Sequence, residues 1–145
     1  MRLAGKIAIV TGGGSGFGAG IANKFVAEGA RVLIADRDAA GAERVAAELG
    51  PAARALRVDV SNAVDVKAMV DAAHDWFGGL NVLVNNAGVS HLPQPLEDVT
   101  EDDFDRVIAV NVKPIYLAAK LVVPRFKAQK HGVILNIAST AGVSP

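Results

Sequence analysis

The sequence predicts an α/β protein in which a mostly parallel β-sheet is covered by helices on both faces. Three observations lead to this fold class. Short apolar runs with β-branched residues alternate along the chain with longer stretches of helical periodicity. A glycine cluster at residues 12–18 joins the first such run to the first helical stretch. Hydrophobic residues make up 51% of the chain and aromatic residues only 5%, which suits a packed α/β core and not a disordered chain.

Five strands and five helices are expected along the chain. The strands are expected at residues 6–11, 31–36, 53–59, 80–84 and 133–138. The helices are expected at residues 19–28, 39–49, 63–77, from 100 onward, and at 112–129. Because right-handed crossovers join strands that alternate with helices, the sheet is expected to be doubly wound and Rossmann-type, with strand order 3-2-1-4-5.

Several helix ends follow from single residues. Ser61 and Asn62 favour the N-terminus of the third helix, because their side chains can accept bonds from free N–H groups. The acids at 101–103 suit the first turn of the fourth helix, where the helix dipole stabilises negative charge. Segment 89–99 contains two prolines and is expected to be a loop. Pro124 falls inside the last helix and is expected to kink it.

The glycine cluster predicts a phosphate-binding turn. Glycines let the chain turn sharply and let a pyrophosphate approach the backbone, while the following helix offers free N–H groups and a positive dipole end. A P-loop is excluded, because Gly18 is followed by Ala19-Gly20 and not by Lys-Ser or Lys-Thr. The other polar clusters also follow strands, so all of them are expected at the carboxyl edge of the sheet.

Asp36 indicates which dinucleotide would bind. It lies eighteen residues after Gly18, at the end of the second expected strand. A carboxylate there can accept hydrogen bonds from an adenosine ribose and repel a 2′-phosphate, and Ser15 offers that phosphate no cation. Arg37 could swing toward a phosphate. NAD is therefore expected in preference to NADP; the alternative is that Asp36 is a solvated cap of the next helix.

Composition argues against several other partners. Fifteen basic residues balance fifteen acidic ones, so no net field draws the chain to nucleic acid or to an anionic membrane. No apolar stretch is expected to approach the roughly 18 residues of a membrane span, and no signal peptide is expected. The three histidines lack ligand spacing, so no metal site is expected. The absence of cysteine is compatible with a cytoplasmic location.

Four motifs in order make the chain resemble the short-chain dehydrogenase/reductase family over essentially its whole length: Thr11-Gly12-x-x-x-Gly16-x-Gly18, Asn85-Asn86-Ala87-Gly88, Asn111 and Ser139. The resemblance implies an NAD-dependent oxidoreductase that interconverts an alcohol and a ketone or aldehyde by hydride transfer. It implies cofactor contacts around the pyrophosphate, the ribose, the adenine and the segment after the fourth strand, at Gly12, Ser15, Gly16, Phe17, Gly18, Asp36, Arg37, Asp59, Val60, Asn86, Ala87 and Gly88.

The same resemblance implies two residues of the catalytic centre. Asn111, at a helix break, would position a water of the proton relay, and Ser139 would hydrogen-bond the substrate carbonyl or alcohol. The alternative for Ser139 is an ordinary turn serine. The family's catalytic Tyr-x-x-x-Lys follows the serine, but the six residues after Ser139 contain neither residue type. Tyr116 and Lys120 have the same spacing but precede the serine, and we interpret both as structural.

The expected whole is one domain, residues 1–145, lacking the carboxy-terminal part of its fold, because the last strand would otherwise leave its outer edge uncovered. The resemblance implies a homo-oligomer, a tetramer or a dimer, built partly on helix 112–129. Its substrate would be a small alcohol or carbonyl compound. The alternative function is a non-catalytic dinucleotide-binding module. A methyltransferase is a weaker alternative, because the first strand ends in Thr11 and carries no acid there.

Overall fold

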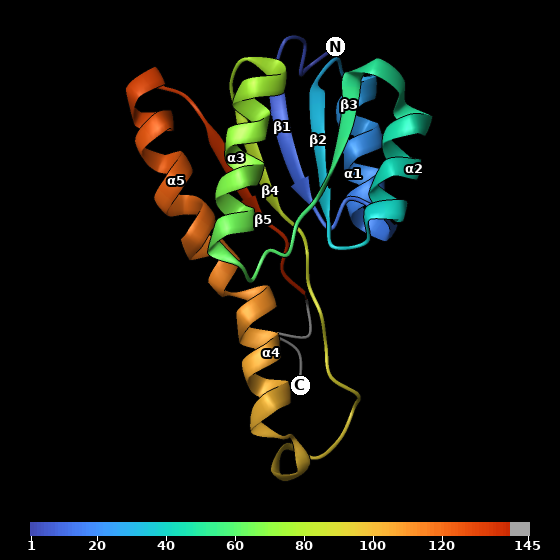
Figure 1. Ribbon diagram of the computed structural model, residues 1–145, viewed down its shortest axis with the longest axis vertical. Coiled ribbons are helices and arrows are strands. Elements are labelled where there is room, and N and C mark those ends of the chain that lie inside the picture. The colour runs from blue at the N-terminus through green and yellow to red at the C-terminus, as the bar shows by residue number, and fades with distance from the viewer. Residues whose placement is uncertain (140–145) are drawn as a thin grey trace.

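Five parallel strands form one sheet in the order β3-β2-β1-β4-β5 (Figure 1). The computed structural model describes residues 1–139. The strands are β1 (Ile7–Thr11), β2 (Arg31–Asp36), β3 (Ala53–Arg57), β4 (Val82–Asn85) and β5 (Val133–Asn136). The predicted doubly wound fold and its strand order are confirmed.

Helices cover both faces of the sheet, as Figure 1 shows. One face carries α1 (Gly16–Ala27) and α2 (Ala39–Leu49), and the other carries α3 (Ala63–Phe77) and α5 (Lys113–Gln129). Helix α4 (Glu101–Asn111) leads into α5 and extends beyond the carboxyl edge of the sheet. Two short 3₁₀ turns, η1 (Gly50–Ala52) and η2 (Leu96–Asp98), complete the described elements.

The two central strands supply the middle of the core. Ile9 of β1 and Leu33 of β2 face the α3 side, whereas Val10 and Ile34 face the α1 side, and all four are fully buried. This alternation follows from the two-residue period of a strand. Because both faces are covered, the inner residues of both strands are apolar, as is typical of parallel sheets.

Most boundaries lie within two or three residues of those predicted. Helix α1 begins at Gly16, inside the glycine cluster, and not at residue 19. Asn62 caps α3 as expected, accepting bonds from the N–H groups of Val64 and Asp65. Helix α5 runs on through Pro124 to Gln129 as one element. A proline removes only its own N–H from the helix ladder, so flanking turns can continue.

The expectation about membrane-length segments is wrong for α4 and α5 taken together. By length and composition alone, residues 101–129 could cross a membrane, and only 17% of their most apolar part is buried. Isolated lysines separate the apolar residues of this segment. Its exposed apolar side chains, at every fourth position, are Phe104, Ile108, Val112 and Tyr116.

Charged side chains tie the outer elements to α3. Arg54 of β3 lies over the ring of Trp76, 4.5 Å from its centroid, which is a cation–π distance. Arg125 of α5 pairs with Asp71 at 3.1 Å. Beside that pair, the Nε2 atom of His74 is buried, and among the described residues it has no hydrogen-bond partner. The packing of α3 therefore includes one desolvated imidazole.

Candidate functional site

A cavity of about 460 Å³ opens at the carboxyl edge of the sheet, beyond β1, β2 and β4. Its volume lies in the range of small-molecule and cofactor sites. Most of its wall comes from the three turns that follow these strands. The lining residues are Gly12, Ser15, Gly16, Phe17, Gly18, Ala35, Asp36, Arg37, Asp38, Val58, Val60, Asn86, Ala87, Gly88, Val89 and Val110.

The glycines of the first turn are required for two different reasons. Gly12 has φ +63°, and a Cβ there would lie 2.9 Å from the Cα of Ala87. A Cβ on Gly18 would overlap the carbonyl of Gly12. Gly16 has φ +52°, with nothing within 4 Å of its missing Cβ, so it presents bare backbone to open space. No side chain caps the N-terminus of α1 at Ser15. The wall can therefore accept an anion close to the backbone.

Thr11 fastens the turn after β4 to the turn after β1. Its hydroxyl accepts bonds from the backbone N–H groups of Asn86, at 2.9 Å, and Ala87, at 3.0 Å, and donates to the carbonyl of Val84. The Asn86 amide donates in turn to the carbonyls of Thr11, at 2.9 Å, and Gly12, at 3.3 Å. Thr11 is only 2% exposed, so these bonds form away from water. Two cavity walls are thus fixed to each other.

Asp36 both lines the cavity and supports the glycine turn. One carboxylate oxygen accepts from the N–H of Gly14 at 2.9 Å, and the other accepts from the N–H of Asp38 at 2.9 Å. Arg44 of α2 donates to the carbonyl of Gly14 at 3.1 Å. A carboxylate has about four acceptor positions, so two remain for the hydroxyl groups of a ligand.

Of the three predicted cofactor contacts that come next after Asp36 along the chain, two line the cavity and one does not. Arg37 and Val60 line the cavity, and so does Val58. Asp59 does not. Its carboxylate accepts from the hydroxyl of Ser61 at 2.6 Å and from the Ser61 N–H at 2.9 Å. The bond from the Ser61 hydroxyl is the main cause that lowers the pKa of Asp59.

Asn111 and Ser139 lie outside the described lining. Asn111 ends α4, at the junction with α5, and its side-chain amide is bonded to the backbone of Val89. Ser139 is exposed and lies three residues beyond β5. Tyr116 is 63% exposed on α5, away from the cavity lining. The interpretation of Tyr116 as a structural residue stays a prediction.

Sequence reasoning missed four lining residues: Ala35, Asp38, Val58 and Val110. Each is a direct neighbour, or lies within two residues, of a residue that the sequence did indicate. Their shared signal is therefore position at the end of a predicted element. Residue type carried no information, because three of the four are small or apolar side chains of the kind that also fill the core.

The geometry fits a dinucleotide. A glycine-lined turn stands at an uncapped helix N-terminus, and a carboxylate with free acceptor positions ends the neighbouring strand. Phosphate groups suit the first feature and a ribose suits the second, in the crevice that doubly wound folds use for ligands. The class defined by fold and cavity is a dinucleotide-binding α/β protein.

Comparison with known proteins then places the chain in a family. A family model described as short chain dehydrogenase matches residues 6–145. The chain is 51% identical to 4-formylbenzenesulfonate dehydrogenase of Comamonas testosteroni and 41% identical to galactitol 2-dehydrogenase of Agrobacterium fabrum. These matches cover 100% and 98% of this chain, and 59% and 56% of the relatives. The chain belongs to the short-chain dehydrogenase family.

A solved structure shows the same fold. The crystal structure of a 3-ketoacyl-(acyl-carrier-protein) reductase from Brucella melitensis, complexed with NADH, superposes with a TM-score of 0.93 at 51% identity. The match covers 96% of this chain and 59% of that one. This chain therefore spans a little under three fifths of the length of the proteins to which it is similar.

Proposed function

We propose that the chain is the cofactor-binding portion of a cytoplasmic, NAD-dependent oxidoreductase that interconverts an alcohol and a ketone or aldehyde. When bound, the nicotinamide cofactor would supply the hydride acceptor or donor. The chain's own part is to bind and orient. Gly16 and Gly18 would lie against the pyrophosphate, and Asn86 and Gly88 would border the nicotinamide half. Membership of the family supports this reading.

One observation carries the proposal: the carboxylate of Asp36 lines the cavity at the end of β2 and keeps acceptor positions open. The charge favours ribose hydroxyls and disfavours a phosphate on the same ribose. Arg37 lines the same part of the cavity and is the only nearby cation in the lining of the described cavity. We expect NAD to bind in preference to NADP because two backbone N–H groups, of Gly14 and Asp38, hold the Asp36 carboxylate in place.

The test is cofactor binding by the purified chain, followed through NADH and NADPH fluorescence. The wild type is expected to bind NADH at least about tenfold more tightly than NADPH, since a like charge beside the phosphate costs at least ~1.4 kcal/mol. Asp36→Asn keeps an acceptor for the Gly14 N–H but removes the charge. It should therefore reduce the ratio of NADH affinity to NADPH affinity without releasing the glycine turn after β1. Asp36→Ala should weaken both cofactors. Equal binding of the two cofactors by the wild type would refute the NAD preference.

The proton-transfer step needs a group outside the described cavity. A tyrosine near pKa 10 is a poor base unless a neighbour lowers that value. The sequence holds a single tyrosine, Tyr116, and it is exposed on α5. This position favours the second candidate function, dinucleotide binding without turnover, for the 145-residue chain taken alone.

Turnover separates the two functions. The chain is incubated with NAD and galactitol, and separately with NADH and the aldehyde 4-formylbenzenesulfonate; both probes appear in the names of relatives. NADH binding without NADH formation from galactitol or NADH consumption by the aldehyde supports the binding module for this chain. Either change in NADH would assign the full reaction to it.

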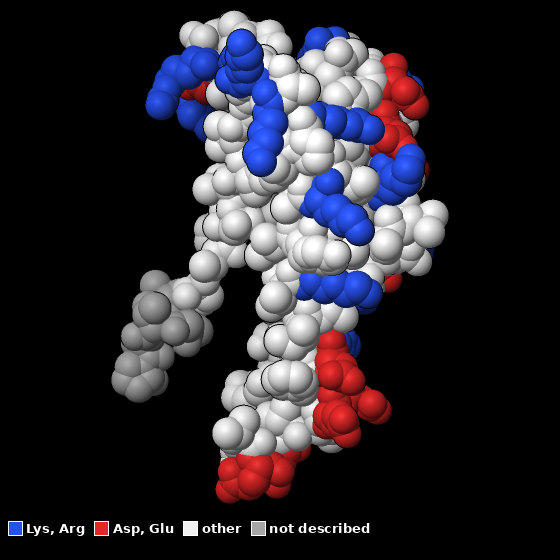
Figure 2. Space-filling model, turned by 90° about the vertical axis from the view of Figure 1, so that its left-hand side faces the viewer, with Lys and Arg blue, Asp and Glu red and all other residues white. Residues whose placement is uncertain are grey.

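We also propose that a second copy of the chain covers the apolar side of α4 and α5. Figure 2 shows uncharged surface along α4, with acidic side chains at its lower end and basic ones higher on the molecule. The exposed residues Phe104, Ile108, Val112 and Tyr116 recur at four-residue spacing on this segment. Sedimentation of the purified chain at several concentrations tests this; a monomer throughout would contradict it.

A further inference from the structure

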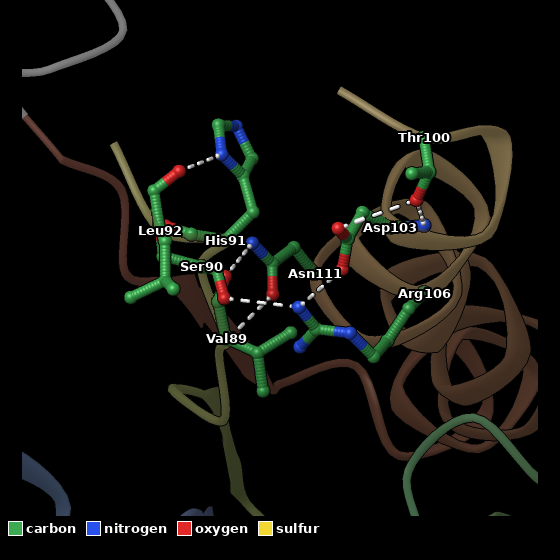
Figure 3. A network of polar contacts seen from close by, with 8 residues as sticks. All are labelled: Val89, Ser90, His91, Leu92, Thr100, Asp103, Arg106 and Asn111. Atoms are coloured by element: carbon green, nitrogen blue, oxygen red, sulfur yellow. Dashed lines mark hydrogen bonds and ion pairs between the residues drawn. The ribbon is translucent and has the colours of Figure 1, made fainter. Parts of the chain in front are cut away.

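The segment that leaves β4 has no strand to pair with, and two side chains of α4 hold it instead (Figure 3). Asn111 accepts from the N–H of Val89 at 2.8 Å and donates to its carbonyl at 2.9 Å. Arg106 donates through Nη2 to the carbonyl of Ser90 at 3.2 Å. Two consecutive loop residues are therefore fastened to one helix.

Arg106 is itself held in place by Asp103, which is in turn bonded to Thr100. Its Nη2 also donates to Asp103 at 3.1 Å, and the other oxygen of Asp103 accepts from the hydroxyl of Thr100 at 3.3 Å. Thr100 is the N-cap of α4 and accepts from the N–H of Asp103. The bond from Arg106 is the main cause that lowers the pKa of Asp103, so this carboxylate stays ionised at neutral pH. The chain of contacts runs from the helix cap to the Ser90 carbonyl.

The fastened segment matters for the cavity because Val89 is part of its lining. The oxygen and the nitrogen of the Asn111 side-chain amide are both hydrogen-bonded to the backbone of Val89, so the orientation of this amide depends on the position of Val89. Ser90 is the next residue, and Arg106 fixes its carbonyl. A shift of Ser90 would move Val89 and turn the Asn111 amide with it.

We propose that Arg106 is a positioning residue, which fastens Ser90 to α4 and thereby sets where Val89 and Asn111 stand at the edge of the cavity. Its consequence for catalysis rests on the proposed function, in which Asn111 belongs to the proton relay. The contact itself does not depend on that function. The chemistry required is a guanidinium that bridges a carboxylate and a backbone carbonyl, which its several donors in a planar fork allow.

The competing explanation is that Arg106 and Asp103 form an ordinary exposed ion pair, which contributes little. The chain offers a matched control. Arg125 and Asp71 are also 3.1 Å apart, with side chains 39% and 35% exposed, against 45% and 37% for Arg106 and Asp103. Arg125 joins α5 to α3, and among the described residues it is not bonded to residues 89–91. The control therefore matches the length and exposure of the ion pair but lacks the contact with the loop.

The experiment measures amide hydrogen exchange of Val89 by NMR in the cofactor-free chain. Arg106→Gln is expected to speed this exchange about three- to tenfold, which corresponds to the net contribution of one ordinary hydrogen bond. Arg106→Lys should restore part of the protection, because its ammonium reaches the same carbonyl as a single donor. Arg125→Gln should leave the Val89 rate unchanged while lowering the melting temperature by a similar amount.

Unchanged exchange in Arg106→Gln, or an equal rise in Arg125→Gln, would overturn the proposal. NADH affinity is recorded in parallel, and it should stay within about twofold of wild type in Arg106→Gln, since the glycine turn lies apart from this contact. A loss as large in Arg125→Gln as in Arg106→Gln would also overturn the positioning role, because the effect would then not depend on contact with the loop. Failure of the wild type to bind NADH would count against the proposed function alone.

Discussion

The two sides of the cavity are held together in different ways. On the β1–β2 side, buried strands and backbone contacts fix the wall, with Ile9 and Leu33 fully buried behind it. On the α4 side, the wall is a loop tied to an exposed helix by the side chains of Arg106 and Asn111. The strand next to it, β5, is also open, and its Leu135 is 43% exposed.

This difference indicates where the chain should tolerate substitutions. On the β1–β2 side, a Cβ added at Gly12 or Gly18 would meet backbone atoms that cannot easily move. Each polar contact of the α4 side is worth about 1 kcal/mol in net terms. We therefore expect substitutions at a few positions of the β1–β2 side to have large effects on stability and cofactor binding. Substitutions on the α4 side should each have a small effect.

The largest effect on the β1–β2 side is expected from Gly18→Ala. The new Cβ would overlap the Gly12 carbonyl, so the turn must move, at a cost of about 3 kcal/mol in unfolding free energy. NADH binding should be lost. Gly20→Ala is the matched control in the same helix, because nothing lies within 4 Å of its missing Cβ. It should stabilise α1 by roughly 0.5–1 kcal/mol. Urea unfolding and NADH titration measure both variants, and equal behaviour would refute the overlap.

A second comparison removes the same side chain on each side. Leu33→Ala empties a fully buried site in β2 and should cost about 3 kcal/mol of unfolding free energy. Leu135→Ala acts on the half-open strand β5 and should cost less than about 1 kcal/mol. Urea denaturation of both variants gives the two values. Similar losses would mean that β5 is covered in solution, for example by a second copy of the chain.

The smallest expected effect is a pH dependence at the contact between α3 and α5. Burial lowers the pKa of His74 below its ordinary value of 6.5, and Arg125 lowers it further. Between these two values the unfolded chain binds a proton that the folded chain does not. Stability should therefore fall as pH drops below about 6.5, until the lower folded pKa of His74 is reached.

His74→Gln isolates that contribution, because the variant has no imidazole to titrate. The difference in unfolding free energy between wild type and variant should change with pH in this window and be constant above it. Asp71 and Asp75 also face His74, and their negative charges work against the shift. Parallel pH profiles for the two proteins would contradict the prediction.

Local pattern was enough to predict the sheet. Strand β2 begins and ends at the predicted residues 31 and 36, and its four inner residues are apolar because that part of the strand is buried on both faces. The glycine turn and Asp36 were also predictable, since both sit directly after strands. The bond between Arg106 and Ser90 was not. It joins an exposed helix to a loop sixteen residues away, and such a contact leaves no periodic signal.

Three residues that the family motif or its spacing indicated lie outside the described lining of the cavity. Asn111 and Ser139 were expected from the family motif, and their catalytic roles stay predictions. Asp59 was expected at the adenine and is bonded to Ser61. Spacing along the chain fixes which element carries a residue. It does not fix the direction in which the side chain leaves that element.

The contact between Arg54 and Trp76 gives the molecule a built-in optical probe. Trp76 is the only tryptophan in the sequence, so all indole emission comes from the junction of β3 and α3. Undocking β3 would remove the guanidinium from the ring face and change that emission. Bound NADH absorbs where indole emits, so energy transfer from Trp76 would report cofactor binding without any label. One fluorophore can thus follow both the folding of the sheet edge and the filling of the cavity.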